Sequence, residues 1–461
     1  MSLTTLKPSL FIGIVAGLTM LYNRANMSLS TQPYKGARDF YPEDKRIQKY
    51  MFGVMRRVAE KFGYEEYDAP ILEPLELYAA KSGEEIVNEQ TYTFEDRGER
   101  KVAIRPEMTP TVSRMVAARR QELAYPVRWY SIPNLWRYER PQRGRLREHW
   151  QLNVDVFGID DITAEHELIV LADTIMQTFG AKRDTYIIRL NSRKLIDAAL
   201  HDYLKLEKVQ AHSLVKLIDR MHKMEAAAFN AQLDATLSPS QREDGTEDKL
   251  RELLKVKDVA HLPGELQSHE SVVQLTSLMK LLDDSLISNV TFDVSLMRGF
   301  DYYTDIVFEV FDTHPENNRS MFGGGRYDGL VGLFGVDPVP TVGFGMGDVT
   351  LQNFLETHAL LPKLKPETEL YVALLGDVYE SAQRVIHDLR EMGINVAVDA
   401  SGRKPDKLIK NALKKNVRYM LFIGDKELQT EQFTLKDLQS NTEEAHSLQR
   451  IVSVIKDYRA A

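Results

Sequence analysis

Polar residues occupy every second position along one short stretch of this chain, and several are types that bind anions or hydrogen-bonding ligands. A period of two sends alternate side chains to opposite faces of a β-strand. Because buried charge is costly without a partner, such a face favours contact with a polar ligand. The alternative is an exposed strand whose polar face is only solvated. The alternating residues are Arg145, Arg147, His149, Gln151, Asn153 and Asp155.

A second strand and an arginine-rich loop come before this stretch. We expect the segment from Val127 to Gly158 to form a hairpin, in which Arg137 and Glu139 extend the same polar face. Trp136, Trp150 and the high density of arginine in this segment favour the ligand-binding interpretation over a solvated strand. The sequence therefore predicts that this hairpin carries the contacts to a polar ligand.

Glu107 and Thr109 lie at a predicted turn from a strand, residues 101–105, into a helix that ends near Arg120. Thr and Glu in the first turn of a helix need no ligand, because they can cap the helix or interact with its dipole. Taken alone, these two residues therefore favour capping.

Composition limits the possible classes of protein. At 461 residues the chain is too long for one hydrophobic core and is expected to form two or three domains. Its 43% hydrophobic and 27% charged residues are ordinary for a globular protein. The sequence has no cysteine, which excludes disulfides, thiolate metal sites and cysteine nucleophiles. A net charge of −8 means that local basic patches must carry any contact with nucleic acid.

The N-terminal residues 1–30 are expected to be a disordered extension or a wrongly assigned start. The apolar run from Leu10 to Leu21 is short of the ~20 residues that a membrane-spanning helix needs. It is preceded by Lys7 but is not followed by a small-residue cleavage pattern. The sequence from Met27 onward resembles a natural chain start, and a membrane anchor is the alternative.

Strand and helix signals fill residues 31–192 and return in residues 289–361. Residues 193–288 are instead rich in Leu, Lys, Asp and Glu and lack strand signals. The pattern predicts a mixed core in two parts with a helical insertion between them. Within the insertion, Ser238–Lys249 is expected to be a loop.

The last part of the chain, residues 368–461, follows a linker and alternates strands with helices. This alternation predicts a separate small α/β domain with a mixed sheet, closed by a helix that starts at Glu443. A solvated helix face is the usual meaning of a basic cluster, and a nucleic-acid contact is the more specific one. The domain's basic cluster is Arg403, Lys404, Lys407, Lys410, Lys414 and Lys415.

Glycine-rich segments do not indicate a nucleotide loop. Gly323–Arg326 lacks the Gly-Lys-Ser/Thr that a P-loop requires, and Gly343–Gly347 lacks dinucleotide-binding spacing. Both segments favour close approach of backbones in a sheet. No histidine spacing supports a set of metal ligands formed by protein side chains alone.

Several motifs together resemble the histidyl-tRNA synthetase family of class II aminoacyl-tRNA synthetases, from about Tyr34 onward. The family's opening is similar to KGARDFYPED, and the first class II motif is similar to the segment from Tyr41 to Pro70. The two histidine-specific sequences are similar to RGFDYYTDIVFE (298–309) and GGGRYDGL (323–330). The hairpin and TVGFGMG (341–347) resemble the second and third class II motifs.

This resemblance implies an α+β fold: a class II catalytic core with an antiparallel sheet flanked by helices, a helical insertion and an α/β anticodon-binding domain. The implied reaction is ATP-dependent activation of histidine, with Mg²⁺, and transfer to the 3′ end of tRNA(His). The family also implies a homodimer formed through the first motif, a cytoplasmic location and no membrane partner. Attack of the carboxylate on the α-phosphorus builds negative charge that fixed cations stabilise.

The resemblance assigns roles toward ATP residue by residue. Arg137 would hold the α-phosphate, Glu139 the adenine amino group and Arg145 the outer phosphates. Arg298 would occupy a place that other class II enzymes give to a metal, so Arg298 and Arg137 are the expected catalytic residues. His149 replaces a phenylalanine that stacks on adenine.

Other roles concern histidine and tRNA. Glu107 and Tyr303 would bracket the imidazole nitrogens, and Tyr302 would line the same pocket. A site that contacts both imidazole nitrogens would reject amino acids without these two nitrogens, because their binding would leave buried polar groups of the site unpaired. The α-amino group would be bound by Thr109, Gln151 and Asp155. The tRNA would contact Arg140 and Gln142 near its acceptor end, and Lys410 and Lys414 on the anticodon side.

Like the change to His149, a second departure from the family bears on ATP. Thr350 stands where the family has the arginine of its third motif, which stacks on adenine and reaches the γ-phosphate. We expect ATP to be held differently rather than activity to be lost. The rival interpretation is a non-catalytic, histidine-sensing paralogue, such as the regulatory subunit of ATP phosphoribosyltransferase.

Overall fold

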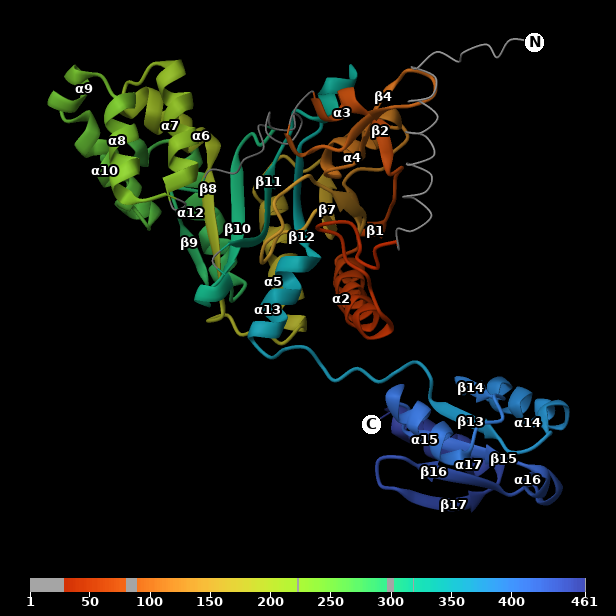
Figure 1. Ribbon diagram of the computed structural model, residues 1–461. Coiled ribbons are helices and arrows are strands. Elements are labelled where there is room, and N and C mark those ends of the chain that lie inside the picture. The colour runs from red at the N-terminus through yellow and green to blue at the C-terminus, as the bar shows by residue number, and fades with distance from the viewer. Residues whose placement is uncertain (1–28, 80–88, 222–223, 297–301, 318, 461) are drawn as a thin grey trace, which may run out of the picture. The chain divides into compact units, whose positions relative to one another are not determined.

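The computed structural model describes residues 29–79, 89–221, 224–296, 302–317 and 319–460 (Figure 1). Almost all of the expected N-terminal extension lies outside these ranges. The chain divides into two compact units. The first comprises the described parts of Met1–Asp39 and Met51–Leu360, and the second comprises Phe40–Tyr50 and Leu361–Ala461. Within the described ranges, no helix is both long and apolar enough to cross a bilayer.

A nine-stranded sheet forms the centre of the first unit, in the order β1-β5-β7-β12-β11-β10-β8-β9, with β6 paired to β7 beside this path. Neighbouring strands are antiparallel except for the parallel pairs β1–β5 and β8–β9. This arrangement confirms the expected α+β core. The strands are β1 (Glu65–Glu66), β5 (Val127–Ser131), β6 (Asn134–Trp136), β7 (Glu148–Phe157), β8 (Tyr186–Ser192), β9 (Val290–Phe292), β10 (Ile306–Asp312), β11 (Ser320–Arg326) and β12 (Thr341–Gly347).

Two amphipathic helices contact the middle of this sheet. Helix α5 (Thr163–Thr178) contacts β12, and α13 (Asp348–Thr357) contacts β7, β11 and β12. On α5, Leu168, Leu171 and Ile175 recur at helical spacing and are buried. Because α13 follows β12 directly, the strand and the helix form one continuous support below the hairpin.

Helix α4 places the turn that carries Glu107 and Thr109. Its residues Val112 and Val116 join Val127 and Phe157 in one buried cluster, which fixes α4 against β5 and β7. Strands β2, β4 and β3 form a separate small sheet, and β4 leads into α4. The surrounding elements are α2 (Pro42–Lys61), β2 (Leu72–Pro74), α3 (Leu75–Ala79), β3 (Thr93–Glu95), β4 (Lys101–Ile104) and α4 (Thr109–Ala118).

Between β8 and β9 the described chain is helical. The expectation of a loop over Ser238–Lys249 is wrong, because this stretch contains α9 and the start of α10. Ser238 and Gln241 form a reciprocal capping box that starts α9. The elements are α6 (Arg193–Ala198), a π-helix (Ala199–Tyr203), α7 (Lys208–Arg220), α8 (Ala226–Thr236), α9 (Pro239–Glu243), α10 (Thr246–Lys255), a 3₁₀ turn (Val259–His261), α11 (Gly264–Gln267) and α12 (Glu270–Asp284).

The second unit contains a five-stranded mixed sheet in the order β14-β13-β15-β16-β17. Strand β13 is buried on both faces: Leu370 and Val372 join one apolar cluster, and Tyr371 and Ala373 join another. Its elements are β13 (Leu370–Leu374), α14 (Tyr379–Glu391), β14 (Val396–Asp399), α15 (Pro405–Lys414), β15 (Tyr419–Ile423), α16 (Asp425–Thr430), β16 (Phe433–Asp437), β17 (Thr442–His446) and α17 (Leu448–Ala460).

The prediction of a helix starting at Glu443 is wrong. Residues Thr442–His446 form β17, an edge strand that pairs with β16, and the helix begins only at Leu448. In this pairing Glu443 lies opposite Lys436, and the two side chains form an ion pair at 2.5 Å. Pairing with the preceding strand, β16, therefore overrides the local helix preference.

Candidate active site

Glycines on β12 make room for the polar side chains of β7. In the register of these strands, Asp155 lies opposite Gly343 and Gln151 lies opposite Gly347. A Cβ atom on Gly343 would overlap Oδ1 of Asp155, and one on Gly345 would overlap Nε2 of Gln151. A Cβ atom on Gly324 would overlap the backbone oxygen of Gly343, so the expected close approach of backbones is confirmed. The glycines of β12 also let polar side chains lie across the neighbouring strand.

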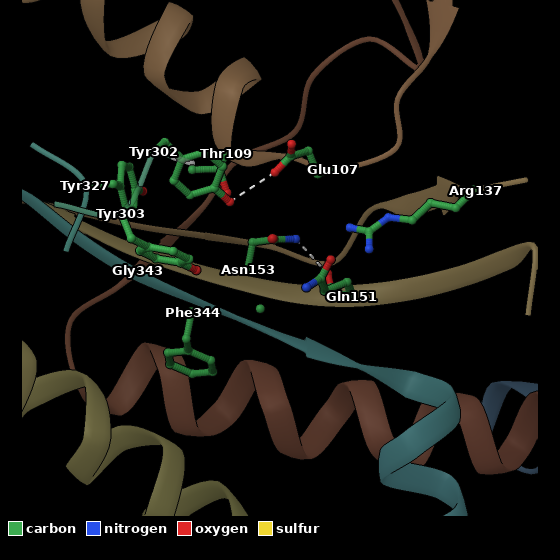
Figure 2. Close-up of a pocket in the computed structure, with 11 residues that line it drawn as sticks. Glu107, Thr109, Arg137, Gln151, Asn153, Tyr302, Tyr303, Tyr327, Gly343 and Phe344 are labelled. Atoms are coloured by element: carbon green, nitrogen blue, oxygen red, sulfur yellow. Dashed lines mark hydrogen bonds between the residues drawn. The ribbon is translucent and has the colours of Figure 1, made fainter. Parts of the chain in front are cut away.

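A pocket lies over this part of the sheet (Figure 2). Its walls come from the β4–α4 turn, the end of the β6 strand, β7, β12 and the residues around β10 and β11. Six of the side chains expected at the site line it together: Glu107, Thr109, Arg137, Gln151, Tyr302 and Tyr303. The other lining residues are Asn153, Tyr327, Gly343, Phe344 and Gly345.

Glu107 points into the pocket and accepts a hydrogen bond from the hydroxyl of Tyr302 at 3.1 Å (Figure 2). Its carboxylate is buried, with 3% of the residue exposed. Neither Glu107 nor Thr109 is the N-cap of α4, which is Met108 and makes no side-chain cap bond. Both residues instead line the pocket.

Asp155 lies beneath the pocket with one carboxylate oxygen unsatisfied. The hydroxyl of Tyr327 donates to Oδ1, whereas the buried Oδ2 has no hydrogen-bond partner among the described residues. Burial raises the pKa of Asp155 to about 7, and the hydrogen bond from Tyr327 opposes that rise. A buried acceptor without a donor is costly, so this oxygen indicates a ligand that brings a donor.

Arg137 provides a cation at the other end of the pocket. Its Nε donates to the backbone oxygen of Pro106 at 2.8 Å, which fixes the side chain. Figure 2 shows the guanidinium directed toward Gln151. A guanidinium held in this way is preorganised to bind an oxyanion.

Apart from Arg137, the residues expected to bind the nucleotide lie outside the lining of this pocket. Glu139 and Arg145 form an ion pair with each other at 2.8 Å, and only 8% of the Glu139 side chain is exposed. His149 is partly buried. Burial and the nearby charges of Arg137, Arg38 and Arg145 lower its pKa to about 3, so its ring is neutral at ordinary pH.

The polar strand face is shorter than predicted. Strand β7 begins at Glu148, so Arg145 and Arg147 precede it rather than continue its alternation. The guanidinium of Arg147 instead lies over the ring of Tyr138, 3.9 Å from its centroid. A hydrogen bond from the N–H of Arg147 to the backbone oxygen of Gly36 redirects the chain at this point.

An ion pair ties the segment before α2 to the start of α13. Arg38 contacts Oδ2 of Asp348 at 2.6 Å, and Oδ1 of Asp348 accepts the backbone N–H of Trp150 at 3.0 Å. Burial raises the pKa of Asp348, and the charge of Arg38 opposes that rise. Asp348 therefore joins the segment before α2 and the start of α13 to strand β7 of the hairpin.

The remaining expected residues are not among the described residues that line the pocket. Arg298 falls outside the described residues. Arg140 is an exposed residue of the hairpin loop, and Gln142 borders a second cavity. Lys410 and Lys414 are exposed on α15 of the second unit. The parts of the chain that the structure describes hold no group of three or more potential metal ligands.

Two contributors were not assigned from the sequence. Tyr327, which holds Asp155, follows the Gly323–Arg326 segment, and Asn153 lies between Gln151 and Asp155 on the polar face. The alternation of polar residues along β7 would have been sufficient to include Asn153 in the site. Tyr327 lies within GGGRYDGL, one of the two histidine-specific sequences, but the motif does not reveal its contact with Asp155, which joins residues far apart in the sequence.

Comparisons with known proteins agree with this arrangement. The family model for histidyl-tRNA synthetase matches residues 36–349, and the model for an anticodon binding domain matches residues 369–458. Histidine–tRNA ligase of Leptospira biflexa is 44% identical over 431 residues, which cover 93% of this chain and 98% of that protein. Histidine–tRNA ligase of Haloarcula marismortui is 36% identical, covering 88% and 93%.

Solved structures share the fold. Histidyl-tRNA synthetase from Nostoc sp. superposes with a TM-score of 0.77 at 24% identity, covering 94% of this chain and all of that one. An ATP phosphoribosyltransferase regulatory subunit/histidyl-tRNA synthetase from Bacillus halodurans gives 0.70 at 22% identity, covering 86% and 100%. Fold alone does not separate the enzyme from the paralogue, but the extent and identity of the sequence matches do. This chain belongs to the histidyl-tRNA synthetase family.

Proposed function

We propose that the protein is a histidine–tRNA ligase that uses ATP to activate histidine and transfers it to tRNA(His). In the first step a carboxylate oxygen of histidine bonds to the α-phosphorus, and pyrophosphate leaves. In the second, a terminal ribose hydroxyl of the tRNA attacks the carbonyl carbon, and AMP leaves. The histidine carboxylate is already ionised, so the first step needs no general base.

The single observation that carries this proposal is the unsatisfied Oδ2 of Asp155, whose carboxylate contacts Gly343 and Tyr327 in the lining of the pocket. Glu107 lines the same pocket, and two carboxylates in these positions suit a ligand that brings several N–H donors, as histidine does with its ammonium and imidazole. Asp155, with Thr109 and Gln151, would bind the α-amino group. Glu107 and Tyr303 would contact the imidazole, which Tyr302 would also line.

The adjoining segment would take ATP. Arg137 would hold the α-phosphate at the pocket's end, where the charge of the transition state develops. Glu139 and Arg145 would contact the adenine amino group and the outer phosphates, once their ion pair opens. The neutral ring of His149 would stack on adenine. Mg²⁺ would arrive bound to the ATP phosphates, as part of the substrate.

The matched anticodon binding domain supports a tRNA partner. Lys410 and Lys414, exposed on α15, would contact phosphates on the anticodon side, and Arg140 and Gln142 would lie near the acceptor end. Two copies would form a homodimer through the first class II motif, and the protein would work in the cytoplasm. Replacing both lysines with alanine should lower the rate of tRNA charging and leave histidine activation unchanged, whereas unchanged charging would refute this assignment.

Histidine-dependent exchange of pyrophosphate into ATP tests the main proposal. We expect exchange with histidine and none with other amino acids. A protein that binds histidine without supporting exchange would be the regulatory paralogue instead. Arg298→Ala should abolish exchange and leave histidine binding nearly intact, because Arg298 is proposed to take the place of a catalytic metal and not to bind histidine. Loss of both would show that its role is a different one.

A further inference from the structure

A second cavity lies at the tip of the hairpin and contains about 710 Å³ of space that is open to solvent. It is bordered by the hairpin loop at Gly144, by β11 at Met321, and by α13 at Thr350 and Asn353. The pocket described above is bordered by the same hairpin, through Arg137 and Gln151, and by the strand that leads into α13. Both cavities are therefore bordered by the hairpin and by the continuous segment of β12 and α13.

Thr350 borders this cavity with a neutral side chain, so it provides no positive charge for an anionic ligand. Its hydroxyl donates to the backbone oxygen of Met321 at 2.6 Å and is thereby used within the protein. Its methyl group faces Gly144, where an added Cβ would lie 3.4 Å from Cγ2 of Thr350 and 4.0 Å from Cδ of Arg319. Arg319 thus reaches the same small region from the loop that precedes β11.

The two arginines that border this cavity differ in their contacts with the rest of the protein. Arg143 is held by Asn317, which accepts from its Nε at 3.0 Å, and by the hydroxyl of Thr357, also at 3.0 Å. Glu316 lies 3.7 Å from the same guanidinium and offsets its charge. Arg319 is exposed and makes no hydrogen bond or ion pair with another described residue. An uncommitted guanidinium beside an open cavity suits an anionic ligand with several oxygens.

We propose that Arg319 binds the outer phosphates of ATP in this cavity and supplies the charge that Thr350 cannot. This inference rests on the proposed function, because it assumes that the nucleotide lies along the hairpin with its α-phosphate near Arg137. The triphosphate would then run from Arg137 toward the loop tip. Arg319 is a binding residue for the β- and γ-phosphates in this arrangement, and it does not contact adenine.

Binding measurements on the full-length protein separate this role from a structural one. Calorimetric titration should show ATP binding weakened about 10-fold or more in Arg319→Ala, as expected for a lost charge-assisted bond, with partial recovery in Arg319→Lys. Binding of AMP, which lacks the outer phosphates, should be unchanged. Arg384→Ala, a change on the exposed face of α14, is the matched control.

A rescue variant sharpens the test. Introducing Thr350→Arg into Arg319→Ala should restore much of the ATP affinity, because the new guanidinium enters the same cavity. Equal loss of ATP and AMP binding, or unchanged ATP binding in Arg319→Ala, would overturn the inference. If exchange proceeds in the unaltered protein while Arg319→Ala binds ATP normally, only this inference fails. If the unaltered protein binds no ATP, the proposed function fails with it.

Discussion

The two ends of the site are built from different kinds of segment. The end with Glu107, Tyr302 and Asp155 lies on strand β7 and on the turns before α4 and β10, and hydrogen bonds from Tyr302 and Tyr327 hold its two carboxylates. The end with Glu139, Arg145 and Arg319 lies on loops, where Glu139 and Arg145 bind each other. We infer that the first end selects its ligand by fixed geometry, whereas the second must rearrange before it binds. Selectivity and nucleotide affinity should therefore respond to different substitutions.

The largest effect should come from a larger residue in place of Gly343, which contacts Asp155 at the end of the site with fixed geometry (the fixed end). Gly343→Ala would put a methyl group onto Oδ1 of Asp155 and displace that carboxylate. We expect kcat/KM for histidine in pyrophosphate exchange to fall about 100-fold, because small displacements in a fixed site are costly. Gly347→Ala is the matched control, since its added Cβ would lie 3.5 Å from Oγ1 of Thr350, an ordinary contact. Equal effects of the two changes would contradict a rigid floor.

Removing one charge should have the next largest effect. Asp155→Asn keeps the shape of the side chain and should raise KM for histidine about 30-fold, since a hydrogen bond to a charged group is lost. KM for ATP should stay within experimental error. A rise in both constants would mean that the two ends are coupled.

The same carboxylate should make histidine binding depend on pH. Its pKa of about 7 means that it is largely protonated at pH 6 and ionised at pH 8. Because the ionised form binds a cation better, KM for histidine should fall as pH rises through 7. In Asp155→Asn this component should disappear, and any slope that remains would come from histidine itself.

The end with Glu139, Arg145 and Arg319, which must rearrange before it binds (the adjustable end), should show coupling between its own residues. Glu139→Ala and Arg145→Ala should each raise KM for ATP about 10-fold and leave KM for histidine unchanged. Because these side chains contact each other, the double variant should lose less than the product of the single effects. Strict additivity would show that their ion pair does not bear on nucleotide binding.

The smallest effect should come from His149→Phe. A neutral imidazole and a phenyl ring both offer a flat face to adenine, so KM for ATP should change by no more than about 3-fold. The ratio of variant to unaltered KM should be constant from pH 5 to pH 8, because the pKa of His149 is about 3. A ratio that grows at low pH would show that the ring is charged during binding.

Local patterns predicted the fixed end better than the adjustable one. The alternation of Gln151, Asn153 and Asp155 is a property of a single strand, and the structure brings all three to the pocket or directly beneath it. The glycines of β12 were also interpretable, because strand glycines indicate close approach. The class of fold and the family followed from motifs of the same local kind.

What the sequence did not predict depends on pairings that the pattern of a single strand or helix does not specify. Glu139 and Arg145 lie in the same hairpin loop, but their residue types do not show that they pair, and Tyr327 meets Asp155 only through the fold. Strand β17 was missed because its partner, β16, decides its structure. Helix α9 is a different case: the Ser238–Gln241 capping signature was present but was outweighed by the polar composition around it.

The Arg38–Asp348 ion pair limits how far the chain can be shortened from its N-terminus. Deleting residues up to 26 leaves the pair intact, whereas a start beyond residue 38 leaves Asp348, of which 3% is exposed, as an isolated charge in the interior. Breaking such a pair costs about 3 to 5 kcal/mol. The loss would fall on the helix start that carries Thr350, so trimming a remote terminus would loosen the nucleotide end and spare the amino-acid end.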